Sequence, residues 1–165
     1  MSSRALVLKA RQVLAACRRG GLKLATAESC TGGLIAATLT EIAGSSDVVE
    51  RGFVTYSNAA KTELLSVHEE IISTYGAVSE NVARAMAEGA LRHAPADVAV
   101  SVTGVAGPGG GTPAKPVGLV HLACARRGRQ TLHRRMLFKG NRAAVRRQAV
   151  EIAFRLVLQQ ARTAR

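Results

Sequence analysis

The stretch KLATAESCTGGLIAATLTEI, residues 23–42, passes from a short apolar segment through two glycines into a run rich in alanine, leucine and isoleucine. Residues 23–27 are predicted to form a strand and residues 31–42 a helix. A strand that leads directly into a helix is the building unit of α/β proteins. The stretch therefore predicts an α/β fold.

The same alternation continues along the chain. Further helices are predicted over 3–19, 59–65, 69–74, 79–93 and 141–161, and further strands over 48–49, 52–56, 97–102, 117–123 and 131–138. Ser79 and Asn141 stand at the N-cap positions of the last two predicted helices. Pro95 ends the helix predicted over 79–93. Helices that cover both faces of one sheet are expected. No linker divides the sequence, so residues 1–165 are predicted to form a single domain.

Composition narrows the class of protein. The chain has 165 residues, of which 47% are hydrophobic and 21% charged, as in globular proteins that fold in water. No apolar run approaches the about 18 residues needed to span a bilayer. Residues 1–24 are interrupted by basic side chains and lack the apolar stretch and cleavage site of a signal peptide. We therefore expect a cytoplasmic protein without membrane association.

The spacing of the cysteines and histidines is not typical of a disulfide framework or of a metal site. The three cysteines are Cys17, Cys30 and Cys124, and the four histidines are His68, His93, His121 and His133. The cysteine count is odd and no CxxC pair exists. The histidines show no paired ligand spacing. Neither a structural disulfide nor a bound metal is expected.

Positive charge is concentrated at the C-terminal end. Residues 126–165 hold 12 of the 23 lysines and arginines but only one acidic residue, Glu151. Such a segment could contact nucleic acid. Only Phe138 and Phe154 could stack on bases there, so specific nucleic-acid binding is not expected. The favoured interpretation is a solvated basic face, and some arginines could instead recognise a phosphorylated small molecule.

Three segments carry residues that core packing does not explain. The first, residues 27–33, lies at the strand-to-helix junction, where ligands of open α/β sheets collect. Ser29 would stand there beside the free N–H groups of a helix N-terminus, and Gly32 and Gly33 would admit a ligand close to the backbone. The alternative is that Ser29 or Thr31 merely caps the helix.

The second segment is YSNAAK, residues 56–61, again at a strand-to-helix junction. A serine nucleophile needs a base, and none of the three segments contains a histidine. A lysine can serve when burial or nearby cations lower its pKa. Lys61 is therefore the candidate base, with Tyr56 as a hydrogen-bonding partner or proton relay. The alternative is an ordinary surface lysine in the first turn of a helix.

The third segment, residues 101–118, is a strand that runs into a long glycine-rich loop. Ordering such a loop is entropically costly, which is typical of a binding role or a mobile lid. Its backbone N–H groups could hold a phosphate. The alternative is a flexible connection between two strands.

Four stretches together resemble the CinA C-terminal domain family, the nicotinamide-nucleotide amidases. They are TAESCTGG at 26–33, GSSDVVERGFVTYSNAAK at 44–61, GAVSENVARAMAEGAL at 76–91 and SVTGVAGPGGGTPAKPVG at 101–118. The resemblance covers residues 5–160 and indicates a stand-alone version of the domain. It implies a three-layer α/β/α sandwich that hydrolyses the carboxamide of nicotinamide mononucleotide to nicotinate mononucleotide and ammonia, in pyridine-nucleotide recycling, without a cofactor.

The resemblance also implies roles for individual residues. Ser29 matches the nucleophile, Lys61 the general base and Tyr56 the assisting hydroxyl. Expected substrate-binding residues are Glu28, Thr31, Gly32, Gly33, Thr103, Gly104 and Arg142. Arg146 and Arg147, one turn further along the same helix, are alternatives to Arg142. Backbone N–H groups near residues 31–33 are expected to hold the oxyanion.

Other interpretations remain open at this stage. Cys30 is a rival nucleophile, although it lacks a neighbouring histidine and a packing role is favoured for it. A non-catalytic nucleotide-binding module is a second function, and a competence- or DNA-damage-associated protein is a third. The resemblance and the apolar helices also lead us to expect a homodimer.

Overall fold

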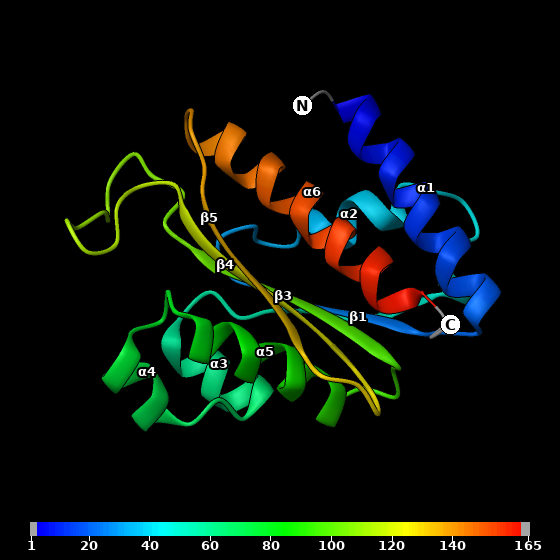
Figure 1. Cartoon of the computed structure of the whole chain (residues 1–165), viewed down its shortest axis with the longest axis horizontal. Coiled ribbons are helices and arrows are strands. Elements are labelled where there is room, and N and C mark those ends of the chain that lie inside the picture. Colours follow the sequence, from blue (N-terminus) through cyan, green and yellow to red (C-terminus); the bar gives the residue numbers. More distant parts are fainter. Residues whose placement is uncertain (1–2, 163–165) are drawn as a thin grey trace.

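Five strands form one mixed sheet at the centre of the computed structural model, which describes residues 3–162 (Figure 1). They are β1 (Leu24–Glu28), β2 (Val49–Val54), β3 (Val98–Gly104), β4 (Leu119–Arg126) and β5 (Leu132–Leu137). Their order across the sheet is β2-β1-β3-β4-β5. β1 pairs in parallel with β2 and β3, whereas β4 is antiparallel to both of its neighbours. The carboxyl ends of β1 and β3 therefore lie side by side.

Helices cover both faces of the sheet (Figure 1). One face carries α1 (Ser3–Gly20), α2 (Leu34–Thr40) and α6 (Arg142–Ala161). The other carries α3 (Asn58–Leu65), α4 (Glu69–Tyr75) and α5 (Glu80–Arg92). A short 3₁₀ turn, η1 (Ser45–Asp47), precedes β2. The predicted α/β fold with three α/β/α layers is confirmed.

Side-chain size differs between the two faces of the sheet. Val98, Val100 and Val102 of β3 pack into the core beneath α1, α2 and α6. Ala25 and Ala27 of β1 point to the opposite face, where α5 packs on alanines from three strands. Alternation along a strand sends successive side chains to opposite faces. Each fully buried valine contributes about 1.5–3 kcal/mol, so the valine-rich face supplies much of the hydrophobic stabilisation.

Among the differences between the predicted and the observed boundaries, two concern β2 and α2. Residues 49–54 form one strand, β2 (Val49–Val54), where two strands were predicted, over 48–49 and 52–56. The helix predicted over 31–42 begins only at Leu34, because Gly32 and Gly33 have φ values of +56° and +98°. These left-handed conformations suit glycine and keep the backbone out of the helix. The segment that follows Glu28 is therefore an irregular loop.

The helix caps were largely predictable. The side chain of Ser79 accepts a hydrogen bond from the N–H of Val82, and that of Asn141 accepts one from Ala144. The predicted N-caps of α5 and α6 are thus confirmed.

Among residues 3–162, no helix combines the length and the apolar character that crossing a membrane requires.

Candidate active site

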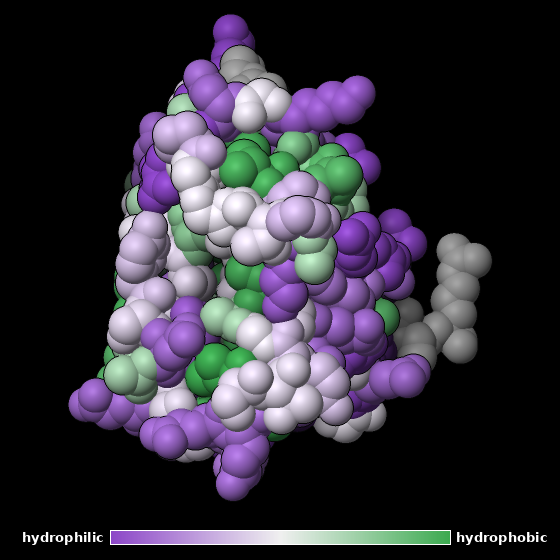
Figure 2. Space-filling model, turned by 90° about the vertical axis from the view of Figure 1, so that its left-hand side faces the viewer, coloured by the Kyte–Doolittle hydropathy of each residue, from purple (hydrophilic) through white to green (hydrophobic). Residues whose placement is uncertain are grey.

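A small cavity of about 220 Å³ lies where β1 and β3 end. Its lining comes from five separate segments and consists of Ser29, Cys30, Tyr56, Asn58, Lys61, Ala77, Val78, Thr103, Gly104, Ala106 and Arg142. Figure 2 faces this end of the molecule, where apolar surface runs down the middle of the face and hydrophilic side chains flank it. The three segments that core packing did not explain, residues 27–33, 56–61 and 101–118, therefore meet at the carboxyl ends of β1 and β3.

Ser29 and Lys61 are in direct contact inside this cavity. Lys61 Nζ lies 3.1 Å from Ser29 Oγ, although the two residues are 32 positions apart in the chain. Ser29 is held at the end of β1 because its N–H donates to the carbonyl of Val102 on β3. Lys61 comes from α3, whose N-cap Ser57 accepts from Ala60 N. The parallel strands β1 and β2 bring the two segments together.

Lys61 is buried, with only 1% of its surface exposed. Its ammonium group also donates to the carbonyl of Thr55 at 3.0 Å. Burial penalises the charged form and lowers the pKa of Lys61, while its electrostatic interaction with Cys30 raises it. Within residues 3–162, no carboxylate lies close enough to form an ion pair with Lys61. The alternative of an ordinary surface lysine is therefore wrong.

Cys30 lies next to Ser29 and also lines the cavity. Burial raises the pKa of its thiol to about 11, although its own backbone N–H, Arg146 and Lys61 act to lower that pKa. The thiol is therefore protonated at neutral pH, and a protonated thiol is a poor nucleophile. The chemistry of the cavity favours Ser29 over Cys30.

Tyr56 and Arg142 meet at the mouth of the cavity. Arg142 Nη2 donates to the Tyr56 hydroxyl at 2.9 Å, and Nη1 donates to the carbonyl of Gly107 at the same distance. Arg142 stands in the first turn of α6, so one guanidinium links the segment between β2 and α3, the glycine-rich loop and a helix N-terminus. The contact that Tyr56 makes with Lys61 is through its backbone carbonyl, at 3.5 Å.

Thr103 and Gly104 lie at the end of β3 and line the cavity, close to Ser29. The Thr103 hydroxyl donates to the carbonyl of Ala77, so it ties β3 to the segment before α5. A side chain at Gly104 would collide with β4, since its Cβ would lie 2.7 Å from Val120 Cγ2 and 2.8 Å from Leu119 O. The strand can therefore carry only glycine there without moving its neighbour.

Glu28, expected to bind substrate, is instead turned into the protein. It is fully buried, and its carboxylate accepts hydrogen bonds from Ile35 N at 2.8 Å and Ala36 N at 3.0 Å. A carboxylate at a helix N-terminus satisfies free N–H groups and complements the helix dipole. No side chain of Ser29 or Thr31 caps α2, so the capping alternative for those residues is wrong.

Thr31, Gly32 and Gly33 form the loop between Ser29 and α2, and none of them belongs to the cavity lining. The loop is tightly folded, since Gly32 N donates to Ser29 O and Leu34 N donates to Thr31 O. In the structure these three residues therefore shape the segment that presents Ser29.

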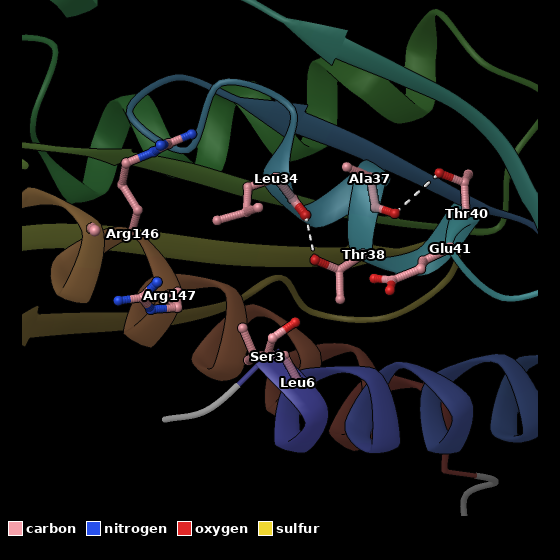
Figure 3. Close-up of a pocket in the computed structure, with 10 residues that line it drawn as sticks. Ser3, Leu6, Leu34, Ala37, Thr38, Thr40, Glu41, Arg146 and Arg147 are labelled. Carbon is pink, nitrogen blue, oxygen red and sulfur yellow. Dashed lines mark hydrogen bonds between the residues drawn. The ribbon is translucent and has the colours of Figure 1, made fainter.

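Arg146 and Arg147, the alternatives to Arg142, line a different hollow. This groove of about 580 Å³ lies between α1, α2 and α6 (Figure 3). Arg146 extends towards the loop before α2, where its Nη2 donates to the carbonyl of Thr31 at 2.8 Å. Of the three arginines, only Arg142 lines the cavity that holds Ser29.

Several lining residues have no recognisable signal in the sequence. Asn58, Ala77, Val78 and Ala106 are ordinary residue types, and only the folded chain brings them to the cavity. The role of the Thr55 carbonyl in holding Lys61 is equally invisible, because a backbone group carries no residue signature. Across residues 3–162, no group of three or more histidine, cysteine, aspartate or glutamate side chains is placed to hold a metal ion.

Comparisons with known proteins agree with this architecture. The family model of the CinA C-terminal domain matches residues 8–161. A CinA-like protein from Akkermansia muciniphila is 59% identical over 126 residues, which are 76% of this chain but 30% of that protein. The nicotinamide-nucleotide amidohydrolase PncC of Escherichia coli (strain K12) is 49% identical over 160 residues, which are 97% of both chains.

A solved structure also matches closely. The competence/damage inducible protein CihA from Agrobacterium tumefaciens superposes with a TM-score of 0.94 and 47% identity, over 98% of each chain. The family model covers almost the whole chain, and sequence and structure matches point to the same family. The chain belongs to the CinA C-terminal domain family.

Proposed function

We propose that this protein is an amidase that hydrolyses the carboxamide of nicotinamide mononucleotide, releasing ammonia and nicotinate mononucleotide. The observation that carries the proposal is the contact between Ser29 Oγ and the buried Nζ of Lys61, at 3.1 Å in a cavity. The relation to the Escherichia coli amidohydrolase, which extends over 97% of both chains, supplies the substrate class.

Lys61 acts as the general base in this mechanism. Its pKa is lowered by burial, so a larger share of the enzyme carries a neutral amine than at an exposed lysine. The neutral amine can still donate to the Thr55 carbonyl while its lone pair accepts the proton of Ser29. A base within hydrogen-bond reach of the nucleophile meets the geometric requirement for proton transfer.

The proton passes directly from Ser29 to Lys61 rather than through Tyr56. The Tyr56 hydroxyl accepts a hydrogen bond from Arg142, and Tyr56 is 60% exposed at the rim of the cavity. The proposed task of Tyr56 is therefore to orient Arg142 and the substrate. Arg142 is the proposed phosphate ligand, with the glycine-rich loop held against it through Gly107.

The reaction then proceeds in two steps. Ser29 Oγ forms a bond to the carboxamide carbon, and the resulting tetrahedral intermediate expels ammonia, which takes the proton from Lys61. Water next attacks the acyl-enzyme, and Lys61 again takes the proton. The ester bond to Ser29 then breaks, Ser29 Oγ takes this proton from Lys61, and nicotinate mononucleotide leaves. We place this reaction in pyridine-nucleotide recycling in the cytoplasm, and we propose that a homodimer performs it.

The test is ammonia release from nicotinamide mononucleotide by the purified protein. Wild-type protein is expected to release ammonia, and Ser29→Ala is expected to release none at the same protein concentration. Ser73→Ala serves as the matched control, because Ser73 is an exposed serine of α4 outside the cavity lining. Equal release by wild type and Ser29→Ala would contradict the mechanism, and no release by wild type would contradict the substrate.

A further inference from the structure

The loop after Ser29 leaves few backbone N–H groups free. Gly32 N donates to Ser29 O, and Leu34 N donates to Thr31 O. The next two N–H groups, at the start of α2, are taken by the carboxylate of Glu28. The anion-binding end of this helix is therefore already occupied by a side chain of the protein itself.

Three N–H groups of the loop have no oxygen acceptor within residues 3–162. They belong to Cys30, Thr31 and Gly33. Of these residues, only Cys30 lines the cavity that holds Ser29 and Lys61. The Cys30 N–H is also the group that directly follows the nucleophile along the chain, so it cannot lie far from Ser29 Oγ.

A second N–H that lacks an oxygen acceptor within residues 3–162 comes from β3. Even-numbered residues of this strand bond towards β1, since Val98 N donates to Lys23 O and Val102 O accepts from Ser29 N. Odd-numbered residues bond towards β4, as Val105 N does with Leu119 O. Gly104 therefore points its N–H towards β1.

The strand β1 ends before it can use that group. Its last residue, Glu28, lies opposite Val102, two positions before Gly104. The Gly104 N–H is thus directed into the space beyond the end of β1, and Gly104 lines the same cavity as Ser29. A backbone donor left unpaired beside a nucleophile is costly unless it has a functional use.

We propose that the backbone N–H groups of Cys30 and Gly104 form the oxyanion hole of this enzyme. One donor follows the nucleophile on β1 and the other comes from the neighbouring strand β3. The assignment replaces the expectation that residues 31–33 supply the donors, because the Gly32 N–H is already bonded and neither Thr31 nor Gly33 lines the cavity. It rests on the proposed amidase function.

The chemistry assigned to the two donors is electrostatic. When Ser29 Oγ bonds to the carboxamide carbon, the electron pair of the C=O double bond moves onto the oxygen. The two N–H groups donate to this oxyanion, and the pair returns when the bond to nitrogen breaks and ammonia leaves. Donors that are fixed before the reaction stabilise the transition state more than the ground state.

Backbone ester substitution tests the proposal without changing side chains. Glycolic acid in place of Gly104 replaces only the N–H by an oxygen atom, which suits a site where any Cβ would collide with β4. Lactic acid at position 30 is compared with Cys30→Ala, from which it differs by the same single replacement. Glycolic acid at Gly128, in the turn after β4, is the control.

Each of the two ester variants is expected to lower kcat by about 10²–10³-fold. KM is expected to change only a few-fold, because the donors act on charge that develops in the transition state. The Gly128 control is expected to keep the wild-type kcat. Its ester also makes the preceding carbonyl a weaker hydrogen-bond acceptor, so the control accounts for this side effect. Thermal unfolding of all variants checks that the fold is retained.

A second reaction separates this proposal from the proposed substrate. Acetylation of Ser29 by p-nitrophenyl acetate forms a similar oxyanion and needs no nicotinamide nucleotide. If wild type releases no ammonia but acetylation falls in both ester variants, the substrate is wrong and the donors stand. If the Gly104 ester keeps the wild-type rates and the ester at position 30 keeps the rates of Cys30→Ala in both reactions, the assignment of the donors is overturned.

Discussion

At the scale of single residues, Lys61 is the most informative group. A buried lysine without a carboxylate partner costs folding free energy, and such an arrangement is expected where the neutral amine is used. The Thr55 carbonyl and Ser29 Oγ accept its hydrogens at 3.0 and 3.1 Å. This geometry gives a base that is held in place but is not fixed in its charged form.

Replacement of Lys61 separates the charge of the side chain from its basicity. Lys61→Met is expected to lower kcat/KM by about 10²–10⁴-fold, the usual contribution of a general base. Lys61→Arg is expected to be as inactive, because arginine keeps the positive charge but cannot be neutral in a protein. Substantial activity in Lys61→Arg would show that charge, rather than proton transfer, is what the reaction needs.

The pH dependence of kcat/KM follows from the same residue. Lys61 must be neutral in the free enzyme, and burial lowers its pKa below the ordinary value of 10.5. Activity is therefore expected to rise with pH and to level off above the lowered pKa, within a pH range below 10.5. A kcat/KM that falls as the pH rises through this range would contradict the assignment of Lys61 as the base.

At the scale of elements, the short helix α2 is tied to the end of β1 by one buried carboxylate. Glu28 accepts from the N–H groups of Ile35 and Ala36, and its own carbonyl accepts from Thr55 N. The same residue thus positions the loop that presents Ser29 and the strand end that holds Lys61. The family resemblance led us to expect a substrate contact for Glu28, and a sequence does not show which way a side chain turns at the end of a strand.

Substitution of Glu28 is expected to lower the stability of the fold. Glu28→Gln replaces one accepting oxygen with an amide that faces a backbone N–H, so we expect a loss of about 1–3 kcal/mol in the free energy of unfolding. Urea denaturation measures this loss. Glu41→Gln, an exposed carboxylate at the end of the same helix, is the control and is expected to have little effect.

Strand β4 carries a group that predicts acid sensitivity. His121 Nδ1 lies 2.9 Å from His133 Nε2 on β5, and Glu80 of α5 lies 3.6 Å from His133. Burial, followed by repulsion from His133 and Arg135, lowers the pKa of His121 to about 4. Burial also lowers the pKa of His133, against the attraction of Glu80.

The lowered pKa values of His121 and His133 determine how the stability of the fold depends on pH. Both rings bind protons more readily in the unfolded chain, where the pKa is about 6.5. The folded state is therefore expected to lose stability as the pH falls from about 6.5 towards 4, and to keep it above that range. In His121→Gln the free energy of unfolding should depend less on pH, whereas exposed His68→Gln should keep the wild-type slope.

The limits of sequence-based prediction are clearest at this scale. Helical and strand periodicity is a local property, and it predicted nearly every element and the caps Ser79 and Asn141. The start of α2 was missed because the φ values of Gly32 and Gly33 depend on the loop as a whole. The free N–H of Gly104 depends on where a neighbouring strand ends, which no local pattern reveals.

At the scale of the whole molecule, the chain carries a net charge of +12, and three arginines of its basic C-terminal segment make contacts inside the protein. Arg126 and Arg129 donate to the carbonyl of Gln160 at the end of α6. Arg127 donates to the carbonyl of Leu91 in the last turn of α5 and to those of Ala94 and Ala96 after it. Cations near helix C-termini stabilise the unpaired carbonyl groups there. The basic segment therefore has a structural task in this fold.

Removal of one such arginine tests this interpretation. Arg127→Ala leaves three carbonyl groups without their donor, so we expect the free energy of unfolding to fall by about 1–3 kcal/mol. Arg11→Ala, on the exposed side of α1, is the control and should change it little. Unchanged stability in Arg127→Ala, together with a loss of DNA binding at low salt, would instead favour a nucleic-acid surface.

The central claim is that Ser29 attacks the substrate and carries it as an ester. The most direct measurement is rapid acid quenching of the wild-type reaction with nicotinamide mononucleotide, followed by peptide mapping by mass spectrometry. We predict an acyl adduct on the peptide that contains Ser29, located on Ser29 itself and absent from Ser29→Ala. An adduct on Cys30, or turnover by Ser29→Ala at the wild-type rate, would contradict the account.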